Sequence, residues 1–352
     1  MERDPVAQLP AETVQHNEVI GASTLREVLT AVDAQLVNGE IGHQKILPTH
    51  FSPLDDVLNG GIRTGDLVIL GGPSGVGKTI FALQLARNIA LNDPDTAVMY
   101  ICYEHDRWHL LMRLLCMESA LMGHGEAALT LRRLAQLLGD PVAQQSGLLT
   151  TLRTHPLYGA VLTRLEQYAD RLTLVKASGS LTTLSQLRLW ARRLRSPKSH
   201  GFMVVDYLQK IPHESAVPIP ENEVTTLHAQ GLKELALSAE IRLLAVAAAD
   251  RSGLQSRRVR LYDMRGSSAI QYEADVGIII NNKYTVVSRE HIVYNPIQAE
   301  AMRNWVVFSI EKNRSGRSGV DLEFRLDASH FCMDPRGGYV HDKLIDDRLT
   351  LE

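Results

Sequence analysis

The stretch 68-VILGGPSGVGKTIFALQ-84 decides the fold, because it runs from an apolar strand through a glycine-rich turn into a helix. Gly72 to Thr79 match the pattern GxxxxGK[ST] in the context that this motif requires. Glycines let backbone amides turn toward phosphates, and the helix N-terminus adds partial positive charge. Lys78 would reach the β and γ phosphates, and the Thr79 hydroxyl would bind Mg²⁺. The expected ATP contacts are Gly72, Pro73, Ser74, Gly75, Val76, Gly77, Lys78, Thr79 and Ile80.

Two carboxylates are candidates for the rest of a hydrolytic site. Asp206 ends the apolar run in 202-FMVVDYLQ-209, where a Walker-B aspartate binds the metal. Glu104 ends 97-AVMYICYE-104 at the same sheet edge, where a carboxylate is expected to lie adjacent to the phosphate loop (Gly72–Thr79) and could act as general base on water. The alternative for Glu104 is a carboxylate stabilised by the dipole of the following helix. His105 and His109 lack a third ligand at metal-binding spacing, so only nucleotide-bound Mg²⁺ is expected.

From residue 66 onward, short β-branched runs alternate with helical segments, from 67-LVILG-71 to 305-WVVFSIEK-312. Near-continuous apolar strands separated by helices are typical of a parallel sheet covered on both faces. We therefore predict one α/β domain over residues 45–333, with a mostly parallel twisted sheet. Residues 334–352 are expected to form a polar tail.

Composition excludes several classes of protein. The chain has 352 residues, a net charge of −3 and three widely spaced cysteines, so neither a disulfide framework nor a zinc knuckle is indicated. The mildly acidic balance limits any nucleic-acid contact to a local surface. Neither a signal peptide nor an apolar run of the ~18 residues that span a bilayer is present. We expect a soluble cytoplasmic protein without membrane contact.

The N-terminal region is predicted to stand apart from the core. Residues 1–21 are polar and are expected to form a flexible leader. Within 22–44, apolar residues recur at helical spacing after Ser23 or Thr24, either of which is a plausible N-cap. The stripe consists of Leu25, Val28, Leu29, Val32 and Leu36. It would pack on its own domain or on a neighbouring subunit.

Seven segments in order resemble the RecA-like ATPase domain of DnaB-type replicative helicases, over most of residues 25–333. Among them, 202-FMVVDYLQ-209 is similar to the family's DYLQ signature and 103-YEHDRWHLLMRLL-115 to its glutamate-plus-arginine segment. The others are 50-HFSPLDDVLNGGIRTGDLVILGGPSGVGKT-79, 177-ASGSLTTLSQLRLWARRLR-195, 222-NEVTTLHAQGLKELALSAEI-241, 263-DMRGSSAIQYEAD-275 and 311-EKNRSGRSG-319.

The resemblance implies roles at the matching positions. Glu104 would be the catalytic glutamate, and Arg113 an arginine near the nucleotide. Lys312 and Arg314 match a K-x-R pair that one subunit inserts into the next subunit's ATP site. Hydrolysis would then need a neighbour, which implies a homo-oligomer, most simply a hexameric ring or an open helical assembly. The helix within 22–44 would be the linker that packs on the adjacent subunit.

The chain also differs from the family pattern. Only about twenty residues precede the expected linker helix, so the N-terminal collar domain is expected to be missing. Where the family has a glutamine that senses the γ-phosphate, this chain has Ala248. Either Asp250 or Arg251 takes over that role, or the coupling of hydrolysis to movement is weakened. The segment 210–224 is acidic, which disfavours a phosphate backbone.

Arginines after residue 250 are the candidate contacts to single-stranded DNA. In a ring they would form a basic collar around the pore, and a solvated loop is the alternative. The residues are Arg257, Arg258, Arg260 and Arg265. Three functions stay open: a Mg²⁺-dependent ATPase that moves single-stranded DNA, a nucleotide-switched assembly protein that acts on a protein partner in the manner of clock-type RecA-fold ATPases, and a recombinase-like filament.

Overall fold

The computed structural model describes residues 23–39, 45–194, 200–214, 219–250, 253–287 and 300–345. The chain divides into two units, residues 1–41 and 42–352. The expected leader 1–21, Arg251 and residues 346–352 of the expected tail lie outside the described residues. Among the described residues, no helix combines the length and the apolarity that a membrane crossing requires.

The described residues of the first unit, 23–39, form the helix α1 (Leu25–Val37). Thr24 is its N-cap: its hydroxyl accepts a hydrogen bond from the Glu27 amide at 3.3 Å, while the Glu27 carboxylate accepts one from the Thr24 amide at 2.7 Å. This reciprocal pair satisfies two amides that an isolated helix end leaves unpaired. None of the side chains of α1 is buried, and Leu25 is 75% exposed. The apolar stripe is therefore available to a partner surface.

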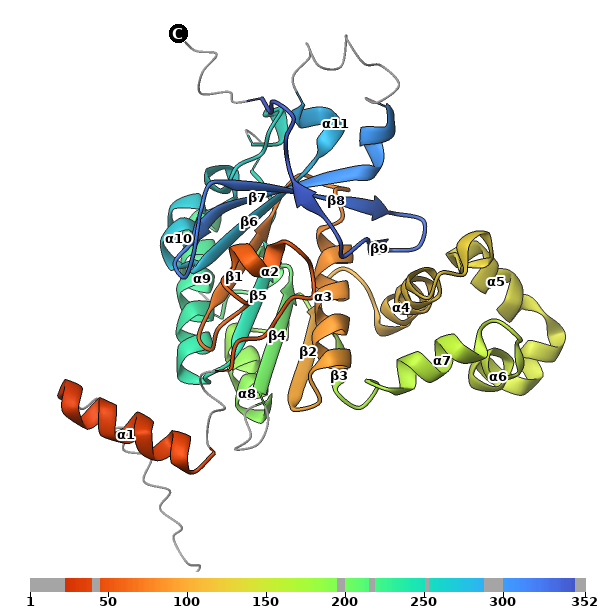
Figure 1. Cartoon of the computed structure of the whole chain (residues 1–352), viewed down its shortest axis with the longest axis horizontal. Helices are drawn as coiled ribbons and strands as arrows, with labels where there is room; N and C mark the ends of the chain where they lie inside the picture. Colours follow the sequence, from red (N-terminus) through yellow and green to blue (C-terminus); the bar gives the residue numbers. More distant parts are fainter. Residues whose placement is uncertain are drawn as a thin grey trace, which may run out of the picture. The chain divides into compact units, whose positions relative to one another are not determined.

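The second unit is an α/β fold built on one ten-stranded sheet (Figure 1). Its strands are β1 (Leu67–Gly71), β2 (Thr96–Cys102), β3 (Leu172–Lys176), β4 (His200–Asp206), β5 (Arg242–Val246), β6 (Val276–Asn282), β7 (Trp305–Asn313), β8 (Val320–Asp327), β9 (Cys332–Met333) and β10 (Gly338–Tyr339). Its α-helices are α2 (Leu54–Val57), α3 (Lys78–Asn92), α4 (Arg107–Leu121), α5 (Leu131–Gly139), α6 (Pro141–Thr154), α7 (Gly159–Glu166), α8 (Leu184–Leu194), α9 (Glu221–Ser238), α10 (Ser267–Glu273) and α11 (Lys283–Val286).

The strand order is β10-β8-β7-β6-β1-β5-β4-β2-β3, and β9 pairs with β8. The strands from β6 to β3 in this order are parallel, as the alternation of strands and helices predicts. The expectation of a parallel strand at 305–312 is wrong, because β7 runs antiparallel to β6 and begins an antiparallel extension. β7 and β8 are joined by a six-residue turn, and such a hairpin needs no crossover helix.

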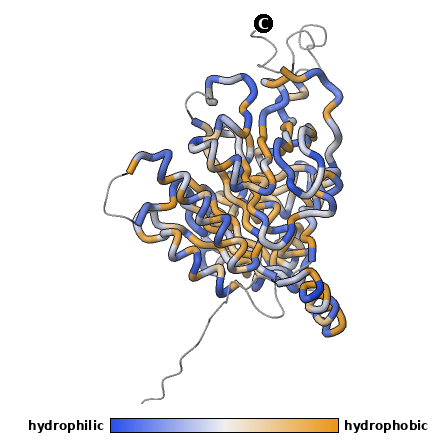
Figure 2. Tube along the Cα trace, turned by 90° about the vertical axis from the view of Figure 1, so that its left-hand side faces the viewer, coloured by the Kyte–Doolittle hydropathy of each residue, from blue (hydrophilic) through white to orange (hydrophobic). Residues whose placement is uncertain are grey.

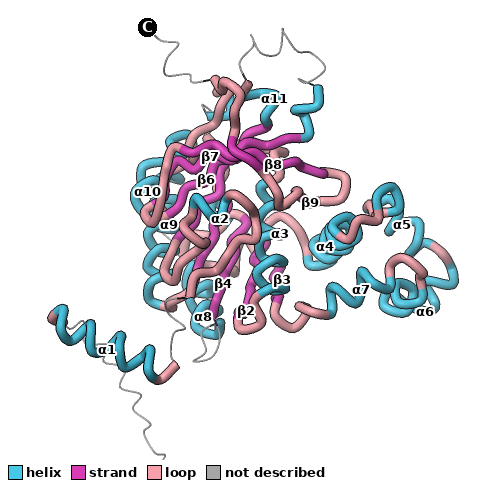
Figure 3. Tube along the Cα trace, viewed as in Figure 1, coloured by secondary structure: helices cyan, strands magenta, loops and turns pink. Residues whose placement is uncertain are grey.

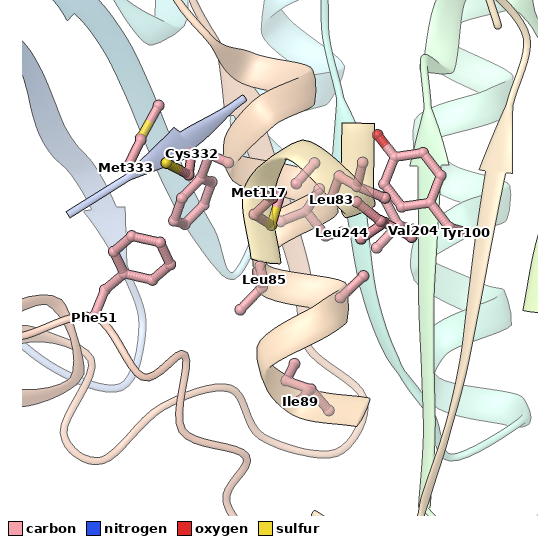
Figure 4. Packing of buried hydrophobic residues seen from close by; sticks show 14 of the residues in the cluster. Phe51, Leu83, Leu85, Ile89, Tyr100, Met117, Val204, Leu244, Cys332 and Met333 are labelled. Carbon is pink, nitrogen blue, oxygen red and sulfur yellow. The ribbon is translucent and has the colours of Figure 1, made fainter. Parts of the chain in front are cut away.

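Helices cover both faces of the sheet. Successive residues of β1 point to opposite faces: Val68 and Leu70 belong to the core under α3 and α4, and Leu67 and Ile69 to the core under α8 to α10. Figure 4 shows the first of these cores, where Leu83 of α3 lies among side chains of the central strands. The apolar segments gather toward the sheet (Figure 2). The prediction of an α/β fold with helices on both faces of the sheet is thus confirmed.

Four helices, α4 to α7, form a helical segment inserted between β2 and β3 (Figure 3). The segment is tied to the phosphate-loop helix by a buried ion pair. Arg87 of α3 donates to both carboxylate oxygens of Glu118 of α4, at 2.6 and 2.5 Å. The Tyr168 hydroxyl donates to the same carboxylate at 2.7 Å. Glu118 has no exposed surface, so the network fixes α4 against α3.

We expect Glu118→Gln to lower the free energy of unfolding by about 3 kcal/mol, because it leaves a buried guanidinium without its counter-charge. Urea denaturation measures this change. The matched control is Glu166→Gln, which breaks an exposed ion pair with Arg153 and should cost less than about 1 kcal/mol. Equal losses in the two variants would contradict a structural role for the buried pair.

Candidate functional site

The loop between β1 and α3 adopts a conformation that glycine permits. Gly72 and Gly77 have φ values of 140° and 94°, and a Cβ atom at Gly72 would lie 2.2 Å from the Ile280 carbonyl oxygen. Lys78 begins α3, and its ammonium donates to the carbonyl oxygens of Gly72 at 2.8 Å and Pro73 at 2.6 Å. Burial lowers the pKa of Lys78, and the carboxylates of Asp206 and Glu104 oppose that shift. The loop therefore holds a desolvated cation at a helix N-terminus.

Asp206 is the last residue of β4 and is 2% exposed. The Tyr100 hydroxyl donates to its Oδ2 at 2.7 Å, and a hydrogen bond links its carboxyl to the Thr79 side chain. Burial raises the pKa of Asp206, and these two hydrogen bonds act against the rise. A hydroxyl and a buried carboxyl side by side are oxygen ligands of the kind that Mg²⁺ prefers. The described residues contain no cluster of three or more metal-binding side chains. Phosphate oxygens or water would have to complete the coordination.

Glu104 follows β2 by two residues, and it lines one cavity together with residues of the phosphate loop, as its expected place at the same sheet edge requires. The sheet order places β5 and β4 between β1 and β2. Glu104 nevertheless lies at the correct edge, because Cys102 at the end of β2 pairs with Asp206. The carboxylates of Glu104 and Asp206 both line a cavity of about 300 Å³. It is lined by Ser74, Gly75, Gly77, Lys78, Thr79, Ile80, Glu104, His105, Arg113, Asp206, Tyr207, Val246, Ala247, Ala248 and Phe331.

Arg113 also lines this cavity, and it meets two residues that sequence reasoning did not assign to the site. Its Nη2 lies 3.0 Å from His105 Nε2, and its guanidinium carbon lies 5.1 Å from the ring centroid of Phe331. The guanidinium of Arg113 can only donate, so His105 Nε2 is the acceptor of this contact. Burial and the charge of Arg113 lower the pKa of His105. The Arg113 Nε is buried without a hydrogen-bond partner. An unpaired donor in a cavity wall fits a site that accepts an anionic ligand.

Ala248 lines the same cavity, and its peptide is held by Gln209 of the DYLQ segment. The Ala248 amide donates to Gln209 Oε1 at 3.0 Å, and Gln209 Nε2 donates to the Arg265 carbonyl oxygen at 3.3 Å. Asp250, a candidate replacement for the missing glutamine, instead accepts a hydrogen bond from the Gly253 amide at 2.6 Å and lines a different pocket. Gln209 thus connects the ends of β4 and β5 with the segment before α10.

Lys312 and Arg314 do not meet the phosphate loop of their own chain. Asn313 pairs with Val276, the first residue of β6, so the pair lies at the amino edge of the parallel strands. The phosphate loop opens at the carboxyl edge, and the five residues of β1 alone span about 16 Å. Lys312 and Arg314 donate to the carbonyl oxygen of Tyr272 at 3.0 and 2.7 Å.

The four arginines assigned to DNA are largely engaged by acidic residues of the same chain. Arg258 is buried and donates to Asp321 at 2.5 Å and to Ser309 Oγ at 3.0 Å. Its burial removes it from a basic collar. The Arg260 guanidinium contacts Glu311 at 3.2 Å, and Arg265 is paired with Glu221. Arg257 is exposed.

Two solved structures are similar to this chain in fold. A solved ATPase domain superimposes with a TM-score of 0.67 at 18% identity, covering 89% of this chain and 99% of that one. A DnaB-like replicative helicase, solved in a study of its interactions with primase, gives 0.64 at 17% identity, covering 89% of this chain and 67% of that one. These likenesses confirm the predicted RecA-like fold.

The sequence comparisons give the family. Residues 47–333 match the DnaB-like helicase C terminal domain, and the chain belongs to that family. It is 28% identical to the replicative DNA helicase DnaB of Rickettsia bellii (strain RML369-C), covering 88% of this chain and 61% of that protein. With DnaB of Geobacillus stearothermophilus the identity is 26%, covering 86% and 60%. The chain thus spans about three fifths of the length of these relatives.

Proposed function

We propose that this protein is a Mg²⁺-dependent ATPase that assembles head to tail in the cytoplasm, most simply as a hexameric ring, and moves along single-stranded DNA. The separation of Lys312 and Arg314 from Lys78 carries the proposal. Each chain has a phosphate loop at one sheet edge and a cationic pair at the other, so two copies placed head to tail complete one site. Membership in the DnaB-like helicase family supports the same assignment.

Each side chain of the proposed ATP site would have its own role in binding or hydrolysis. The phosphate-loop amides and Lys78 would bind the β and γ phosphates, after the ammonium leaves the two carbonyl oxygens that it contacts. Thr79 and Asp206 would hold Mg²⁺, which neutralises phosphate charge during transfer. Glu104, exposed in the cavity, would accept a proton from the attacking water. Arg314 of the neighbouring subunit would stabilise charge on the γ-phosphate, and Lys312 would assist it.

We assign the base-facing wall of the cavity to Phe331, because its aromatic ring, which the Arg113 guanidinium contacts, offers a flat apolar surface. Phe331→Ala is expected to raise the KM for ATP about tenfold and to leave kcat near the wild-type value. Steady-state kinetics measure both constants. Tyr339→Ala, which removes a half-exposed ring away from the cavity, is the control and should leave the KM unchanged. An unchanged KM in Phe331→Ala would reject this assignment.

The linker role of α1 is also part of the proposal. Its exposed stripe includes Leu25 and Leu29, which are 75% and 62% exposed. Burial of these two side chains on a neighbouring subunit would contribute about 1.5–3 kcal/mol each. This packing would hold neighbouring subunits together.

An ATPase assay with and without single-stranded DNA tests the nucleic-acid half of the proposal. Turnover should rise when DNA is added, and DNA binding should weaken as salt increases. If neither stimulation nor binding at low salt is observed, DNA is not the substrate.

A nucleotide-switched protein that acts on a protein partner is the second candidate. The pairing of Arg258, Arg260 and Arg265 with carboxylates of the same chain favours it. Arginines whose charge is neutralised in this way contribute little electrostatic attraction for a phosphate backbone. This candidate predicts slow turnover that DNA leaves unchanged and a protein partner alters.

A further inference from the structure

Asp275 lies between α10 and β6, outside the nucleotide cavity, and is 5% exposed. Its Oδ2 accepts a hydrogen bond from the Leu67 amide at 2.8 Å, and its own amide donates to the Leu67 carbonyl oxygen at 2.9 Å. Leu67 is the first residue of β1, the strand that ends at the phosphate loop. Asp275 is therefore fixed to that strand by one hydrogen bond through its side chain and one through its backbone.

The other oxygen of Asp275 holds Arg314. Arg314 Nη1 donates to Asp275 Oδ1 at 3.0 Å, and the Arg314 amide donates to the Asp275 carbonyl oxygen at 2.9 Å. A third contact, from Arg314 Nη2 to the Tyr272 carbonyl oxygen at 2.7 Å, ties the same guanidinium to the C-terminal end of α10. The Arg314 side chain is still 51% exposed. These contacts fix the orientation of the Arg314 side chain, and part of its guanidinium stays exposed.

Lys312 is held in the same way. Its ammonium donates to the carbonyl oxygens of Gln271 and Tyr272 at the end of α10. Lys233 of α9 is a second cation on Asp275, since it donates to Asp275 Oδ2 at 2.6 Å and to the Gly65 carbonyl oxygen at 2.8 Å. The buried carboxylate of Asp275 thus binds Lys233 of α9 and Arg314 after β7, and it is itself bonded to the first residue of β1.

We propose that Asp275 is a positioning residue that orients Arg314 for the neighbouring subunit's ATP site and ties it to the strand carrying its own subunit's phosphate loop. This inference rests on the proposed inter-subunit site. Asp275 touches no nucleotide in this account, because it acts through Arg314 alone. Its loss should therefore impair the site of the neighbour and spare the ATP site of its own chain.

Asp275→Asn tests the inference, because the amide keeps the side-chain shape but cannot accept hydrogen bonds at both positions. We expect ATP affinity to be unchanged and kcat to fall about 10–100-fold, since small misplacement of a catalytic group has effects of that size. Glu273→Gln removes the same formal charge two residues away and is the matched control. Lys233→Met removes the other cation on Asp275 and should cost stability while retaining turnover.

The decisive measurement uses mixed assemblies. Asp275→Asn and Glu104→Gln chains are co-expressed with different tags, and assemblies carrying both tags are purified. About one quarter of the interfaces then combine an intact catalytic site with an intact Arg314, so activity should recover toward one quarter of the wild-type value. The reference is Arg314→Ala mixed with Glu104→Gln, which should recover in the same way.

The outcomes distinguish a failure of the role proposed for Asp275 from a failure of the proposed inter-subunit ATP site. If the reference mixture recovers and the Asp275→Asn mixture does not, Asp275 serves its own site and this inference is overturned alone. Wild-type activity of Asp275→Asn overturns it as well. If the reference mixture fails to recover, the inter-subunit site is rejected and this inference falls with it. Should Asp275→Asn fail to fold, the double variant Asp275→Asn/Lys233→Met removes the buried charges together and is tested in its place.

Discussion

Lys78→Ala should reduce ATP affinity by about 100-fold or more, because it removes charge-assisted hydrogen bonds to the phosphates. Lys78 is the cation that lies at the helix N-terminus and faces the cavity shared with Asp206 and Glu104. Titration calorimetry with ATP and Mg²⁺ measures the loss. Lys176→Ala, an exposed lysine at the end of β3, is the control and should bind like the wild type. Unchanged affinity of Lys78→Ala would show that the cavity is not the nucleotide site.

Arg314→Ala should retain ATP binding and lose about 1,000-fold or more in turnover, because an arginine supplied in trans acts mainly on charge that develops during phosphoryl transfer. Arg314 lies at the edge of the sheet opposite to the phosphate loop, so its removal leaves the ATP pocket of its own chain unaltered. Parallel binding and turnover assays separate the two effects. Arg317→Ala, an exposed arginine in the same turn, is the control. A loss of binding in Arg314→Ala would contradict a role confined to the neighbour's site.

Local sequence patterns predicted those parts of the molecule that depend on neighbouring residues in the chain. The strand, glycine-rich turn and helix around Lys78 are encoded within twenty residues, and the structure has all three. The Thr24 cap also follows from local spacing, and the structure selects it over Ser23. The alternation of strands and helices predicted the parallel part of the sheet for the same reason.

Contacts between distant segments were not predictable in this way. The acidic partners of Arg258 and Arg260 lie 63 and 51 residues further along the chain, so counting charges within the loop suggested a basic surface that the fold neutralises. Phe331 belongs to no motif and reaches the cavity wall after the antiparallel strands β7 and β8. A pattern of apolar runs does not give strand direction, which explains the error over β7.

ATP turnover by mixed assemblies of Arg314→Ala and Glu104→Gln chains tests whether two neighbouring subunits form each ATP site. Each variant alone should be nearly inactive. Arg314→Ala lacks the arginine that acts in the neighbouring subunit's ATP site, and Glu104→Gln lacks the general base of its own ATP site. In the mixture, about one quarter of the interfaces join an intact Glu104 to an intact Arg314, and activity should recover accordingly. Mixed assemblies that stay as inactive as the separate variants would contradict an ATP site shared between subunits.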